Sequence, residues 1–263
     1  MKYPDSMHTL FQRLLLLLVL IAPAAAAQRP DLPFQSGEAY DLNLMFKIGA
    51  VNTAVGVLHV QIDEERLAGE PVYHAQFSAR TNKFFDVFYK FREHMHSWIG
   101  VQDLHARKFV KEALSGDNAT ANEYIYDWPG KKIHAVITHE GKAPQKMDFP
   151  LDGHVHDIPD LFYYVRTIDP ARLRVGEKIH IGLAVDEAVH EVILTYRGPA
   201  QLKVRKMGEM SAHRFSVSMP NGVLFEGDKE VQLWMEDGGS RRILAIMAPL
   251  RVGSMWGWLA PEA

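Results

Sequence analysis

The chain has 263 residues, of which 47% are hydrophobic and 23% are charged. These fractions are close to globular averages and argue against a disordered chain. The formal net charge of −3 gives no electrostatic reason to expect a nucleic-acid partner, because nucleic-acid binding favours strongly basic surfaces. Cysteine is absent, which excludes disulfides and the lipid attachment that bacterial lipoproteins make through a cysteine.

The N-terminal segment has the pattern of a secretory signal peptide. Lys2 and Arg13 precede an unbroken apolar run, Leu14–Ile21, and small residues follow it as far as Ala27. The run is shorter than the ~20 apolar residues that a membrane-spanning helix needs, so we expect no membrane span. We predict that residues 1–27 are a signal peptide cleaved after Ala27 and that the remaining chain is exported to a bacterial periplasm. A helix belonging to the fold is the alternative that this pattern disfavours.

Apolar and polar residues alternate with a period of two through most of the remaining chain. Such alternation predicts strands with one buried face, which is typical of antiparallel sheets. The apolar members of the clearest runs are Tyr40, Leu42, Leu44 and Phe46; Leu58, Val60 and Ile62; Tyr73, Ala75 and Phe77; Ile133, Ala135 and Ile137; Ile179, Ile181, Leu183 and Val185; Val192, Leu194 and Tyr196; Phe215 and Val217; and Val231, Leu233 and Met235.

Turn-forming residues separate these runs, at Leu67–Pro71, Trp128–Lys131, Met219–Gly222 and Glu236–Gly239. Neither a polar linker nor an internal repeat divides residues 28–263, so we predict one β-rich domain there. A sheet of ten or more strands cannot stay flat and open. The predicted fold is therefore all-β and mainly antiparallel: a strongly curved sheet or an incomplete barrel with an apolar concave side.

One segment has helical periodicity instead. Between residues 157 and 168 the apolar positions follow a spacing of three and four. Asp157 is suited to cap the helix, Pro159 to occupy its first turn, and Asp169-Pro170 to end it. We predict one short amphipathic helix that covers the concave side of the sheet. The segment Asn82–Tyr89 is a second candidate, either a helical turn or an aromatic loop.

Three segments, residues 37–62, 157–166 and 231–254, carry a family resemblance in their order and spacing. They contain Gly37-Glu38 before an alternating strand, then Tyr163, Tyr164 and Arg166 in the helix, and finally Trp234, the turn at Asp237–Arg242 and Gly253-Ser254. On these residues, and over about residues 36–255, the chain resembles the bacterial exported family catalogued as domain of unknown function 3108. The resemblance implies an exported, mostly β protein, and it brings no agreed catalytic residues to this sequence.

The sharpest cluster of metal-ligating residue types is Asp152, His154, His156 and Asp157. A His-x-His pair on a strand places both imidazoles on one face, and the neighbouring carboxylates would complete a metal site. Against this interpretation, the four residues lie in a loop that leads into the predicted helix, where capping would occupy Asp157. A solvated loop is therefore the favoured interpretation, and the four residues remain candidate metal ligands.

The sequence favours a binding protein over an enzyme. It lacks a Gly-x-Ser-x-Gly elbow, a cysteine nucleophile and a Gly-rich phosphate loop before a helix, so we expect no cofactor. We expect a periplasmic protein, without enzymatic activity, that binds an apolar or amphipathic envelope component or a partner polypeptide on a curved sheet. A lipid, a glycan or an envelope protein would fit that role. The alternative is a metal-dependent enzyme or metal-handling protein that uses the cluster at residues 152–157.

Overall fold

The computed structural model describes residues 31–218 and 230–261. The predicted signal peptide and the predicted turn at Met219–Gly222 lie outside these residues. The chain divides into two units, Met1–Asp31 and Leu32–Ala263, and the fold below is that of the second unit. None of the helices within the described ranges is long and apolar enough to cross a bilayer.

Strands dominate the described chain, as the alternation of apolar and polar residues predicted. The helical elements are α2 (Ile158–Thr167) and two short 3-10 helices, η1 (Phe85–Val87) and η2 (Pro170–Arg172). The strands are β1 (Glu38–Ile48), β2 (Val51–Leu67), β3 (Glu70–Thr81), β4 (Phe91–Gly100), β5 (Ala106–Ser115), β6 (Asn118–Asp127), β7 (Lys132–His139), β8 (Gln145–Pro150), β9 (Val155–His156), β10 (Lys178–Val185), β11 (Ala188–Val204), β12 (Gly208–Ser218), β13 (Val231–Glu236), β14 (Ile243–Pro249) and β15 (Ser254–Leu259).

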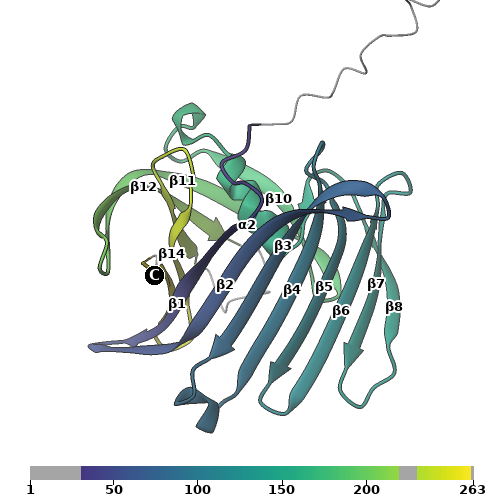
Figure 1. Ribbon diagram of the computed structural model, residues 1–263, viewed down its shortest axis with the longest axis horizontal. Helices are drawn as coiled ribbons and strands as arrows, with labels where there is room; N and C mark the ends of the chain where they lie inside the picture. Colours follow the sequence, from purple (N-terminus) through teal and green to yellow (C-terminus); the bar gives the residue numbers. More distant parts are fainter. Residues whose placement is uncertain (1–30, 219–229, 262–263) are drawn as a thin grey trace, which may run out of the picture. The chain divides into compact units, whose positions relative to one another are not determined.

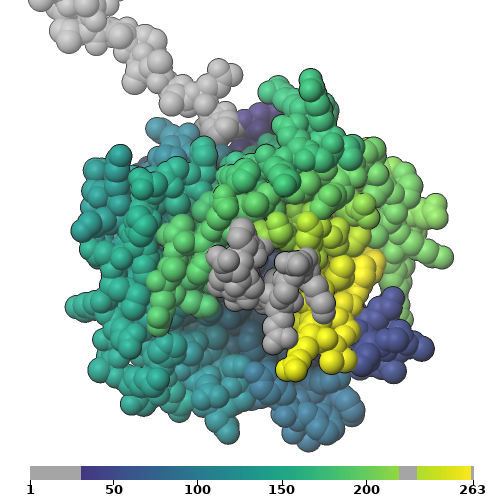
Figure 2. Space-filling view, turned by 180° about the vertical axis from the view of Figure 1, so that it is seen from behind, coloured from purple at the N-terminus to yellow at the C-terminus, as the bar shows by residue number. Residues whose placement is uncertain are grey.

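One sheet of 15 strands contains all of them, in the order β8-β7-β6-β5-β4-β3-β2-β1-β15-β14-β13-β12-β11-β10-β9. Neighbouring strands pair antiparallel, except that β9 and β10 pair in parallel. β1 lies between β2 and β15, so N-terminal and C-terminal strands are neighbours, as Figure 2 shows in purple-blue and yellow. β8 and β9 are the two edges, and the sheet curls strongly without closing into a barrel (Figure 1). The predicted fold class is confirmed.

The core lies on the concave face of the sheet. Successive side chains of a strand point to opposite faces, and the inward members of the predicted runs are buried; Ile133 and Leu194, for example, are 0% and 1% exposed. Buried side chains from both ends of the sheet, from Phe149 of β8 to Ile181 of β10, belong to one continuous cluster. Because the sheet curls, side chains from its two ends pack against each other in one core.

The predicted helix is confirmed as α2, which packs against β3 and β4 on one wing of the sheet and against β10 on the other (Figure 1). Asp157 is its N-cap, since one carboxylate oxygen accepts a hydrogen bond from the Asp160 amide at 3.0 Å. Pro159 occupies the first turn, where its missing N–H costs little. Phe162 and Val165 are buried. The helix thus covers the concave face, as its apolar spacing predicted.

Candidate functional site

The space between α2 and the concave face contains an apolar cavity of about 350 Å³. Period-two alternation creates its wall, because every second residue of each contributing strand points inward. Glu93 is the one polar residue among the described residues that line it. The others are Leu44, Leu58, Phe77, Ala79, Met95, Ile158, Leu161, Phe162, Val165, Ile181, Leu183, Val192, Leu194, Val217, Val231, Leu233, Ile246 and Ala248.

Several of these apolar side chains are only half-buried although they belong to the inward face. Leu44, Leu58, Leu161, Val217 and Ile246 all retain exposed area. A fully packed core would bury such side chains, and each that stays accessible forgoes part of the ~25 cal/mol per Å² that burial contributes. The concave face therefore keeps apolar surface that a ligand could cover.

A polar recess adjoins the apolar cavity. Glu93, at the cavity wall, lies 3.9 Å from the Nζ of Lys111, which in turn lies 3.7 Å from a carboxylate oxygen of Asp186. Burial raises the pKa of the Glu93 carboxyl above its ordinary value, and the Lys111 ammonium acts in the opposite direction. Lys111 and Asp186 also line a second cavity of about 310 Å³, together with Thr120, Asn122, Ile137, His139, Glu187, Ala188 and His190.

The recess also contains an unpaired acceptor. Asn122 is 5% exposed, and its Oδ1 has no hydrogen-bond partner among the described residues. A buried carbonyl oxygen without a donor is costly, and such groups mark places where a ligand or a water completes the bonding. The concave side therefore combines a large apolar wall with a neighbouring set of charged and polar groups. This is an arrangement suited to an amphipathic molecule.

A separate polar network anchors the start of α2. Asp157 Oδ2 accepts a hydrogen bond from Ser97 Oγ at 2.8 Å and a longer one from the Tyr126 hydroxyl at 3.4 Å. The Nδ1 of His156 lies 2.6 Å from Asp160 Oδ2. All five side chains are buried. Because the Ser97 hydroxyl is directed at a carboxylate and not at His156, the network does not form a nucleophile with its base; it holds α2 to β4 and β6.

Burial shifts the protonation of this network. Burial raises the pKa of Asp157 to about 8, and the neighbouring Asp160 carboxylate adds to the effect. Burial alone would lower the pKa of His156, but the Asp160 carboxylate beside the ring outweighs it and raises that pKa. The folded state therefore holds protons here that the free side chains would release near neutral pH.

The four candidate metal ligands do not converge. Asp152 and His154 are exposed, whereas His156 and Asp157 are buried in the network just described. Across residues 31–218 and 230–261, no group of three or more His, Cys, Asp or Glu side chains is placed to hold a metal ion. The two buried candidates have structural roles instead, since Asp157 caps α2 and His156 pairs with Asp160. The sequence pattern alone did not reveal Asp160 as the partner of His156.

Two residues from separate family motifs meet in a buried ion pair. Arg166 of α2, whose side chain is 0% exposed, donates to both carboxylate oxygens of Glu38, at 2.5 and 2.8 Å. Its second terminal nitrogen also donates to the carbonyl oxygens of Pro33 and Ser240. The guanidinium lies 5.3 Å from the centre of the Tyr163 ring. Arg166 thus ties α2 to β1 and to the β13–β14 turn, and no spacing of residue types along the chain indicated this pairing.

Comparison with known proteins gives a family and a fold. A family model described as a protein of unknown function (DUF3108) matches residues 40–255. The crystal structure of a beta-barrel-like protein of domain of unknown function DUF1849 from Brucella abortus is similar, with a TM-score of 0.54 and 11% sequence identity over 86% of this chain and 96% of that one. At this identity the similarity concerns the fold alone. No curated protein matches the sequence. Since the family model covers most of the chain, the protein belongs to the DUF3108 family.

Proposed function

We propose that this protein binds an apolar or amphipathic component of the cell envelope on the concave side of its sheet, without transforming it. The observation that carries the proposal is the apolar cavity between α2 and the sheet. Its volume of about 350 Å³ falls within the ~300–1,000 Å³ typical of small-molecule sites. An acyl chain or a similarly slender apolar group suits a wall in which Glu93 is the one polar residue described.

The polar recess supports an amphipathic ligand over a purely apolar one. Lys111 and Asp186 lie where the apolar wall ends, so an apolar tail in the cavity would place a polar head group against charged side chains. The unpaired Asn122 Oδ1 supplies an acceptor for a head-group hydroxyl or amide. Ligand pockets commonly combine an apolar lining with a few polar groups that fix orientation.

Binding of a fluorescent fatty-acid analogue tests the proposal. Leu58→Trp fills the cavity from β2, whereas Val57→Trp places the same ring on the opposite face of the same strand. We expect saturable binding to the wild type and to Val57→Trp, and binding at least tenfold weaker to Leu58→Trp. Equal affinity for both variants, or no saturable binding to any of the three proteins, would count against a cavity ligand. Far-ultraviolet circular dichroism of each variant checks that the sheet is retained.

Export to the periplasm is the second part of the proposal, and the pattern of residues 1–27 supports it. N-terminal sequencing of the protein from a periplasmic extract of its bacterial host tests it. We expect a mature chain that begins at Gln28. A chain that keeps Met1 and stays in the cytoplasmic fraction would overturn the assignment. Native mass spectrometry of the same preparation would identify a lipid or glycan that remains bound.

A further inference from the structure

Three hairpin turns at one end of the sheet expose apolar side chains. β14, β15, β1, β2, β3 and β4 are consecutive antiparallel neighbours, so the β14–β15, β1–β2 and β3–β4 connections all lie at the same end (Figure 1). Of the nine large hydrophobic residues that are exposed in the described chain, seven lie in these connections or at their borders. We call these seven the apolar rim: Ile48 and Val51; Val252; and Phe84, Val87, Phe88 and Tyr89.

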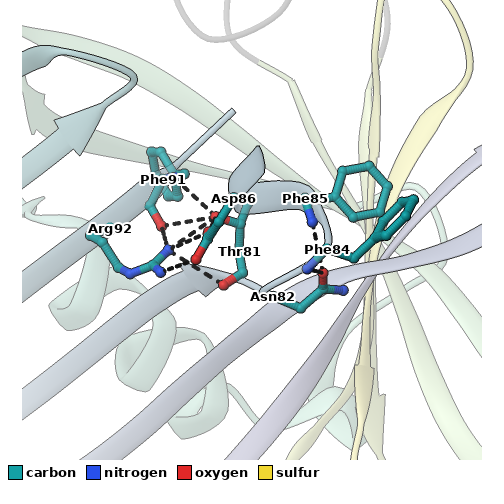
Figure 3. A network of polar contacts seen from close by, with 7 residues as sticks. All are labelled: Thr81, Asn82, Phe84, Phe85, Asp86, Phe91 and Arg92. Atoms are coloured by element: carbon teal, nitrogen blue, oxygen red, sulfur yellow. Dashed lines mark hydrogen bonds and ion pairs between the residues drawn. The ribbon is translucent and has the colours of Figure 1, made fainter. Parts of the chain in front are cut away.

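The longest of these connections, the segment Asn82–Tyr89 with η1, holds its aromatic side chains outward. Phe84, Val87 and Phe88 are 66%, 80% and 73% exposed. Figure 3 shows why the segment is not a loose loop: Asn82 Oδ1 accepts from the amides of Phe84 and Phe85, at 3.1 and 3.0 Å.

Below the rings, the polar side chains of the same connection satisfy one another. Asp86 accepts from the Arg92 guanidinium through both carboxylate oxygens and from the Thr81 hydroxyl at 2.6 Å (Figure 3). The polar groups therefore fix the backbone from within. The rings remain in water, where their burial against a partner would be favourable at ~25 cal/mol per Å².

The three connections that form the apolar rim are rich in basic residues. Residues 47–52, 82–92 and 249–254 contain five basic side chains, at positions 47, 83, 90, 92 and 251, and one acidic side chain, Asp86. Asp86 is paired with Arg92, and Lys47, Lys83 and Lys90 are exposed. The whole chain has a net charge of −3, so the basic character is local to the rim. Its charge complements an anionic surface.

We propose that the apolar rim docks on an anionic phospholipid surface, with the aromatic side chains in the interfacial layer and the lysines against the head groups. Aromatic and aliphatic side chains flanked by lysines are the pattern of interfacial membrane anchors. Separate hairpin tips suit a deformable lipid surface, which can receive each tip, better than a rigid protein groove. Ala79 and Ala248 of the cavity wall lie near the rim ends of β3 and β14, so docking would bring the cavity towards the membrane.

Site-specific fluorescence tests the proposal. Because the chain contains no cysteine, each cysteine variant carries a single thiol for labelling. Val87→Cys and Val175→Cys each receive one environment-sensitive fluorophore; Val175 is 69% exposed and precedes β10, at the opposite end of the sheet. We expect a blue shift at position 87 on vesicles that contain phosphatidylglycerol, and none on pure phosphatidylcholine. We expect no shift at position 175 on either. No shift at position 87, equal shifts at both positions, or equal shifts on both lipids would overturn the proposal.

Charge-reversal variants distinguish recognition of an anionic lipid surface from nonspecific adsorption to vesicles. Lys83→Glu with Lys90→Glu should weaken vesicle binding at position 87 by roughly 30-fold or more, since each lysine near an anionic surface contributes a factor of about five. The matched control, Lys131→Glu with Lys178→Glu, makes the same charge change at the other end, before β7 and at the start of β10, and should leave binding unchanged. Equal losses would overturn the proposal. Leu58→Trp, which tests the cavity, should leave the vesicle signal intact, so the two proposals fail separately.

Discussion

Replacing Glu38 by alanine should destabilise the fold strongly, because it leaves a buried guanidinium without its counter-charge. The Arg166 side chain is 0% exposed and the Glu38 side chain 16% exposed. Removing one partner of a buried ion pair costs ~3–5 kcal/mol. In a domain of this size each kcal/mol of lost stability lowers the melting temperature by about 2–4 °C, so the melting temperature should fall on the order of 10 °C.

Replacing the other partner, Arg166, distinguishes the energetic contribution of its charge from that of its packing. Arg166→Met keeps an apolar stem beside Tyr163 but removes the donors to Glu38, Pro33 and Ser240. Combining it with Glu38→Ala should cost less than the sum of the two single changes, because the double variant contains no uncompensated charge. We expect a coupling energy on the order of 2 kcal/mol from the double-mutant cycle.

A solvent-accessible ion pair provides the control. One terminal nitrogen of Arg197 donates to both carboxylate oxygens of Glu230, at 2.8 and 2.7 Å, but the two side chains are 35% and 32% exposed. Glu230→Ala should therefore cost less than ~1 kcal/mol. Urea unfolding followed by tryptophan fluorescence measures each change through the midpoint at constant m-value. If Glu38→Ala costs no more than Glu230→Ala, the desolvation argument is refuted.

The network at the start of α2 and the spacing between strands give two further predictions. Folding raises the pKa of Asp157 to about 8 and also raises the pKa of His156. At neutral pH the folded state therefore binds more protons than the unfolded state does. The free energy of unfolding should therefore decrease between about pH 5 and pH 9, and Asp157→Asn should flatten this slope in urea titrations; an unchanged slope would contradict the assignment. Gly56→Ala should cost about 1–3 kcal/mol, because an added Cβ would lie 2.1 Å from the Arg80 carbonyl oxygen. Gly239→Ala, with no atom within 4 Å of the new Cβ, should be near neutral, and equal midpoint shifts for the two variants would show that β2 and β3 can move apart.

Local patterns were sufficient to predict the α2 helix and eight of the 15 strands, namely β1–β3, β7 and β10–β13. Side chains alternate across a strand whatever its partners are, so the runs around Val60 and Ala135 could be recognised without knowing the strand order. The α2 helix was equally predictable, because the Asp157 cap and the spacing of Ile158, Leu161 and Val165 all act within ten residues. These features depend on interactions between residues that are close in the sequence.

The same local patterns were silent about the polar contacts. Glu38 and Arg166 are 128 residues apart, and both Ser97 and Tyr126 reach Asp157 from distant strands. The cluster of residues 152–157 illustrates the difference. Proximity in sequence suggested four ligands for one metal, but the fold exposes Asp152 and His154 and buries the other two against partners from elsewhere.

The sequence alone was enough to predict a mainly antiparallel, strongly curved β structure with a capped amphipathic helix, because periodicity and capping are local properties of the chain and a sheet of so many strands cannot stay flat. The tertiary structure was needed to show that the concave side keeps a partly open apolar cavity, that Lys111 lies beside its wall residue Glu93, and that three hairpin turns expose apolar and basic side chains at one end. Strand order and curvature decide which inward side chains face each other across the concave side, and period-two alternation is the same for every strand order.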